Sequence, residues 1–167
     1  MKKITIVLFL ALSFGLTSSI FAQAPGATPQ TALIDLTTAK ALVDAATAEA
    51  RANNANVAIA VVDANGDLVN FNRMDGASAR AVTSSQGKAR AAILFGVSTK
   101  VAADAVAAGT PLSATLTPAA AGAFPITVQQ GGLPIIKDGK VIGGIGVGGA
   151  SSASDEMFGQ KAIDSLK

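Results

Sequence analysis

A glycine-rich hairpin near the end of the chain constrains the fold more than any other feature. Residues 131–149 read GGLPIIKDGKVIGGIGVGG, with Asp138-Gly139 between two apolar runs. An Asp-Gly pair in this position predicts a two-residue β-hairpin turn. The second run also contains the dinucleotide-binding spacing G-x-G-x-x-G. Because these glycines fall inside the returning strand of a hairpin, and not at the first turn of a βαβ unit, we expect no nucleotide cofactor.

Strand alternation explains the glycines better. On a regular strand, Ile145 and Val147 point to one face together with Val141, Gly143 and Gly149. The other face then carries Ile142, Gly144, Gly146 and Gly148, and is almost bare of side chains. Glycine inside a strand is typical of a close approach by another backbone or by a ligand. A packed helix, a partner subunit or a ligand can make that approach.

The remaining elements follow from periodicity and capping signals. Helical spacing predicts a first helix from Asp35 or Thr37 to Asn53-Asn54. It predicts two more helices over 78–96 and 98–109. Ser98 is expected to begin the third helix and Gly109 to end it. Runs 57–63 and 68–74, with Asn65-Gly66 between them, predict another hairpin. Residues 110–124 have no period and indicate a long loop. A last helix follows, capped by Ser152 or Ser154, with Asp155 in its first turn.

The resulting order is α-β-β-α-α-β-β-α in one domain over residues 33–167. Two antiparallel hairpins with helices packed on them predict an α+β fold. Residues 25–32, rich in Pro, Ala and Thr, indicate a flexible tether before the domain.

The first 24 residues resemble an export signal. Lys2 and Lys3 precede an apolar run over 4–16, and Ala22-Gln23-Ala24 supplies small residues for cleavage. We therefore expect a signal peptide over 1–24, a periplasmic or secreted protein, and no stable membrane insertion after cleavage. Without those two lysines, 11 basic residues balance 11 acidic ones. This balance offers no electrostatic footprint for nucleic acid.

The residue types that are missing exclude several chemistries. The chain has no His, Cys, Trp or Tyr. It therefore lacks the Ser–His and Cys–His catalytic pairs, the common zinc ligands, and the usual His, Cys or Tyr ligands of haem iron. No nucleophile–base pair appears at a recognisable spacing, so we predict no catalytic residues and leave any metal undefined.

Three segments resemble the GlcG/HbpS family. They are RMDGA (73–77), SSQGKARAA followed by FG (84–96), and the glycine hairpin with Asp155 downstream. The resemblance covers roughly residues 33–166. It implies about five antiparallel strands flanked by helices, a homo-oligomer, and binding of haem or a related tetrapyrrole, which some members degrade or use in redox sensing.

The chain departs from the family pattern in two places. The glycine strand of the family ends in G-V-S-G, whereas Val147-Gly148-Gly149 lacks the serine here. The family helix carries K-A-x-T-A, whereas Ala91 stands in place of the threonine. With no His, the histidine ligation implied for some relatives does not transfer.

Candidate ligand-binding residues follow from these patterns. Lys88 matches the recurrent family lysine. It could pair with a propionate or another carboxylate, pair with a local Asp, or simply face solvent. Arg73 and Asp75 could bind an acidic ligand or brace a turn, and Met74 could be a thioether ligand or core filler. Asp155 starts a helix whose free amides suit an anion. Gly144, Gly146 and Gly148 complete the set as a surface for close contact.

Three functional hypotheses remain open at this point. The first is an exported, non-enzymatic protein that binds haem or another flat acidic ligand. The second is an enzyme or accessory factor for a small hydroxy or keto acid. The third is an interaction protein whose apolar surfaces build a homo-oligomer.

Overall fold

A computed structural model describes residues 33–113 and 126–166 of the chain. The expected signal peptide (1–24), the tether (25–32) and most of the predicted loop lie outside the described residues. Within the described part, no helix is long and apolar enough to cross a membrane.

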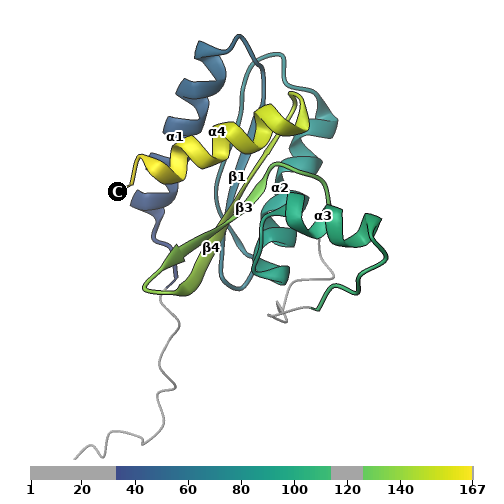
Figure 1. The fold of residues 1–167 in the computed structure, drawn as a ribbon. Helices are drawn as coiled ribbons and strands as arrows, with labels where there is room; N and C mark the ends of the chain where they lie inside the picture. Colours follow the sequence, from purple (N-terminus) through teal and green to yellow (C-terminus); the bar gives the residue numbers. More distant parts are fainter. Residues whose placement is uncertain (1–32, 114–125, 167) are drawn as a thin grey trace, which may run out of the picture.

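Four antiparallel strands form one sheet in the order β2-β1-β4-β3 (Figure 1). Their bounds are β1 (Ala58–Asp63), β2 (Leu68–Arg73), β3 (Gly132–Lys137) and β4 (Lys140–Gly148). The expected antiparallel α+β fold is confirmed, but with four strands among the described residues where the family resemblance implies about five. Residues 126–131, the described part of the segment before β3, form no strand, and the Thr127 amide donates to the Gly87 carbonyl of a helix, 3.1 Å away.

Four helices cover the sheet in the predicted order: α1 (Leu36–Ala52), α2 (Ala79–Phe95), α3 (Thr99–Ala107) and α4 (Ser152–Asp164). Helices α1 and α4 pack on one face, where Ile59, Val61, Ile145 and Val147 of the central strands join the main core with Leu42 and Phe158. Helix α2 packs on the other face against Ala60 and Val62. Helix α3 lies beside α2 and β3 (Figure 1).

The bare glycine face lies directly under α2, so a packed helix, one of the three alternatives, makes the close approach. A methyl group placed on Gly144 would lie 2.7 Å from the Ala89 carbonyl oxygen. On Gly146 it would meet the carbonyl of Ser85, and on Gly148 it would lie 3.0 Å from the Ala81 oxygen. Only hydrogen fits between this strand and the helix.

The predicted alternation fails at the start of β4. Ile135 of β3 pairs with Gly143 and Ile136 pairs with Val141, which leaves Ile142 as an extra residue, a β-bulge. Because of the bulge, Ile142 lies in the main core and Val141 packs on the α2 side, opposite to the prediction. The alternation is correct from Gly143 to Gly148, and Gly149, predicted to continue it, lies beyond the end of the strand.

Side-chain caps define the helix starts. Asp35, Ser78 and Ser98 cap α1, α2 and α3, and each accepts a hydrogen bond from the amide three residues on. Helix α4 is capped by Ser151, not by Ser152 or Ser154 as predicted. Gly149 has a φ of +130°, and β4 ends at Gly148, one residue earlier than predicted. The cap of α4 therefore lies one residue closer to the strand than predicted. Asp155 does lie in the first turn.

Candidate functional site

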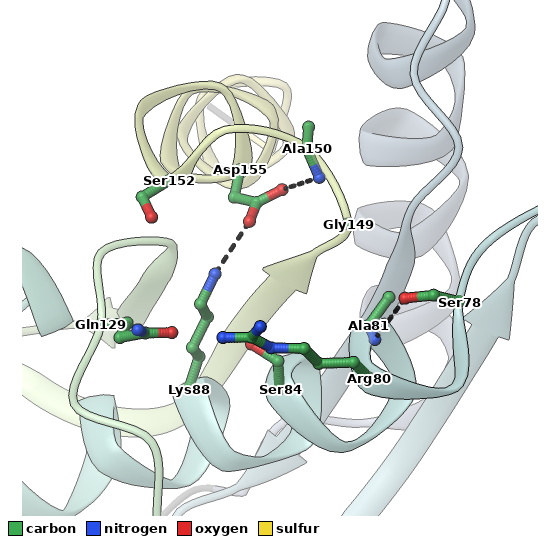
Figure 2. Close-up of a pocket in the computed structure, with 10 residues that line it drawn as sticks. All are labelled: Ser78, Arg80, Ala81, Ser84, Lys88, Gln129, Gly149, Ala150, Ser152 and Asp155. Atoms are coloured by element: carbon green, nitrogen blue, oxygen red, sulfur yellow. Dashed lines mark hydrogen bonds and ion pairs between the residues drawn. The ribbon is translucent and has the colours of Figure 1, made fainter.

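A pocket of about 340 Å³ opens where two helices begin (Figure 2). Ser78, Arg80 and Ala81 come from the first turn of α2, and Gly149, Ala150 and Ser152 lead into α4. Lys88, farther along α2, Asp155 of α4, Ser84 and Gln129 complete the lining. The pocket therefore joins segments that are far apart in the sequence.

A buried ion pair forms one wall of the pocket. Lys88 Nζ donates to Asp155 Oδ2 at 2.8 Å and to the Val147 carbonyl at 2.9 Å. Both side chains are 3% exposed. The second carboxylate oxygen of Asp155 accepts from the Ala150 amide at 3.0 Å. This pair joins α2, β4 and α4, and each group is paired, as charges at this depth must be.

Gly131 makes room for the ion pair, and the sequence analysis missed its role. It is buried with a φ of +122°, a conformation that disfavours other residues. A Cβ atom there would lie 2.8 Å from both Lys88 Nζ and Asp155 Cβ. In the sequence, only the Gly131-Gly132 pair at the start of the predicted strand could have indicated this role.

The electrostatics of the pocket favour an anion. The Arg80 guanidinium extends from α2 into the pocket (Figure 2). Lys88 is balanced by Asp155, so Arg80 is the uncompensated charge of the lining. The first turns of α2 and α4 add the partial positive charge of two helix N-termini. Sequence analysis missed Arg80, because a single arginine in the first turn of a helix carries no distinguishing pattern.

The predicted site residues separate into two groups. Lys88 and Asp155 meet in this pocket. Arg73, Met74 and Asp75 instead line a different pocket of about 370 Å³ with Arg51, Asn56 and Asn72. There, Arg73 Nε and Nη2 donate to the Ala77 carbonyl at 2.9 and 2.7 Å, which braces the turn before α2. Met74 packs against the main core.

The remaining predicted residues, Gly144, Gly146 and Gly148, touch α2 and leave no space for a ligand between strand and helix. Among the described residues, no group of three or more His, Cys, Asp or Glu side chains could hold a metal ion. Resolved pKa shifts lie away from the pocket. The Thr38 amide lowers the pKa of Asp35, burial lowers that of Arg90, and Asp104 raises that of Lys100.

Comparison with known proteins finds relatives in sequence and in structure. A Citrobacter freundii protein, described as an uncharacterized 15.0 kDa protein of the dhaT-dhaS intergenic region, is 35% identical over 141 residues, covering 81% of this chain and 93% of its own length. The crystal structure of a double mutant of Streptomyces reticuli HbpS has a TM-score of 0.74 at 27% identity, covering 87% of this chain and 95% of that one.

A second solved structure, a PduOC complex with haem, has a TM-score of 0.68 at 27% identity and covers 79% of this chain and 94% of that one. The model of the family described as haem degrading protein HbpS-like matches residues 34–164, which is nearly all of the described domain. The chain therefore belongs to the HbpS-like family, as the glycine hairpin and its neighbouring motifs indicated.

Proposed function

We propose that this protein binds an acidic tetrapyrrole of the haem type, and that the pocket between the starts of α2 and α4 receives its carboxylates. One observation carries the proposal: Arg80, the Lys88 ammonium and two helix N-termini converge on a single pocket. The description of the family and the haem complex of a structural relative support this class of ligand.

Each part of the pocket has a separate task in carboxylate binding. The planar guanidinium of Arg80 can donate two parallel hydrogen bonds to one carboxylate. The first turn of α4 lines the same pocket as Arg80, and its amides suit a second negatively charged oxygen. Lys88 adds a charged donor whose position is fixed by Val147 and Asp155.

The lining fits one end of haem only. Its charged and hydroxyl side chains suit propionates, whereas an apolar macrocycle gains little by lying against them. We therefore place the propionates in the pocket and the ring outside its mouth. The lining contains no His, Cys, Tyr or Met to bind iron.

Haem titration tests this function. We expect a saturable shift of the Soret band with the wild-type protein and a dissociation constant at least about tenfold higher for Arg80→Ala, because a charge-assisted carboxylate contact is lost. Arg51→Ala removes an equally exposed arginine from the other pocket and should leave the affinity unchanged. No saturable shift, or equal losses in both variants, would contradict the proposal.

A small hydroxy or keto acid is the second candidate ligand, favoured by the modest volume and polar lining of the same pocket. It predicts that such an acid, and not haem, raises the melting temperature of the wild type but not of Arg80→Ala.

We also propose export, on the basis of the lysine, apolar and small-residue regions of residues 1–24. Mass spectrometry of the protein from a culture fraction outside the cytoplasm should find a chain that begins at Pro25. A full-length chain confined to the cytoplasm would contradict export.

A further inference from the structure

We infer that the pocket recognises its ligand through carboxylates alone, so that an iron-free porphyrin with two propionates binds as well as haem. The inference rests on the proposed function and deepens it, because it separates recognition of the ligand's periphery from coordination of its metal. Four observations carry it.

The first concerns the side chains that usually bind haem iron. The chain has no His, Cys or Tyr and only three Met. Met1 lies outside the described residues. Met74 packs against the main core, and Met157 of α4 lines a separate pocket with Glu156 and Lys161. Neither described thioether lines the carboxylate pocket.

The second concerns Lys88, the one amine in the lining. An amine binds iron through its lone pair and must first lose a proton. Lys88 Nζ is instead a donor to Asp155 and Val147. Its deprotonation would leave the 3%-exposed Asp155 carboxylate without its cation, which buried carboxylates do not tolerate. Lys88 Nζ is therefore committed to the ion pair and to the Val147 carbonyl.

The third concerns Asp155, the one carboxylate in the lining. One oxygen accepts from Lys88 and the other from the Ala150 amide. The side chain is only 3% exposed, and both oxygens already accept hydrogen bonds that hold the start of α4, so Asp155 is poorly placed to bind a metal. Both candidate ligands of the lining are thus already committed to the fold.

The fourth concerns charge. Arg80 contributes one uncompensated positive charge, and two helix N-termini contribute roughly half a charge each. Together they match a ligand with about two negative charges. Two propionates match this charge without iron.

The experiment compares three ligands: haem, protoporphyrin IX, and protoporphyrin IX dimethyl ester, whose carboxylates are masked. Fluorescence anisotropy reports binding of the two iron-free porphyrins, and the shift of the Soret absorbance reports binding of haem, whose iron quenches porphyrin fluorescence. We expect dissociation constants for haem and protoporphyrin IX within about threefold of each other, both raised at least about tenfold by Arg80→Ala, and no saturable binding of the ester.

Other outcomes would contradict particular parts of the inference or the proposed function. Binding of haem but not protoporphyrin IX leaves the proposed function standing and refutes metal independence. Binding of the ester with undiminished affinity refutes carboxylate recognition. Absence of binding by both acids removes the proposed function itself. Met74→Leu with Met157→Leu should leave the Soret position of the haem complex unchanged, and a shift would reveal a thioether ligand.

Discussion

At the scale of single residues, the Lys88–Asp155 pair connects the stability of this protein to its pocket. Its two charges are buried, hydrogen-bonded on both sides and contributed by α2 and α4. Gly131 has no side chain that would occupy the space of the ammonium. A ligand carboxylate, a local Asp and solvent were the alternatives for Lys88, and the structure pairs it instead with Asp155, which is distant in the chain.

Removing one partner of the Lys88–Asp155 pair should destabilise the folded protein. Lys88→Met leaves Asp155 buried without its cation, and breaking such a pair typically lowers the free energy of unfolding by about 3–5 kcal/mol. Urea denaturation measures the loss. Lys100→Met is the matched control, because its ion pair with Asp104 on α3 is exposed and should contribute little. Equal effects of the two variants would show that burial of the Lys88 pair is unimportant.

At the scale of elements, β4 and α2 form a contact that depends on missing side chains. Gly144, Gly146 and Gly148 face α2, which presents small residues such as Ala81, Ser85 and Ala89. Backbone therefore packs against backbone. This contact holds α2 close to the sheet and sets the position of Lys88 next to Val147. The glycine run supports the pocket indirectly and does not line it at these three positions.

Gly146→Ala should disturb this contact. The new methyl group would meet the Ser85 carbonyl and lie 2.5 Å from the Ala89 amide nitrogen, both rigid backbone groups. We expect a loss of about 1–3 kcal/mol or more in the free energy of unfolding, as in overpacked cores. In Gly159→Ala the methyl group meets only the flexible end of Leu133 at 3.3 Å. That control should be neutral or gain up to about 1 kcal/mol from helix propensity. Equal losses would disprove the close-contact explanation.

At the scale of the whole molecule, apolar side chains remain exposed around one edge of the sheet. Ile136 on the edge strand β3 is 58% exposed, and Val101 and Val106 of α3 and Met157 of α4 are exposed as well. An edge strand with an exposed apolar side chain is typical of a surface that associates. We propose that this edge contacts further copies of the chain in a homo-oligomer.

Light scattering tests the oligomer. We expect a mass of several chains for the wild type and a smaller mass for Ile136→Lys, because a charge would be buried in the contact. Leu68→Lys changes an exposed residue of β2, the opposite edge strand, and should leave the mass unchanged. A monomeric wild type would rule out this proposal.

The sequence by itself determined the order of the elements, both hairpins, the Ser98 cap of α3 and the approximate starts of α1 and α2. These features depend on hydrogen bonds and hydrophobic contacts between residues close in the chain, so local patterns such as Asp138-Gly139 are sufficient. Two local predictions were wrong, because each depends on how β4 pairs and ends. The bulge at Ile142 depends on β3, and the position of the α4 cap depends on how β4 ends.

Only the tertiary structure decided the pocket. Lys88 and Asp155 are 67 positions apart, and Arg80 and Gln129 carry no pattern that marks them as neighbours. The packing of α2 on the glycine face brings the starts of α2 and α4 together. It also separates Arg73, Met74 and Asp75 from Lys88, although all four were plausible members of one site by residue type. A site formed by long-range packing depends on the sum of many weak contacts, which no single segment of the sequence contains.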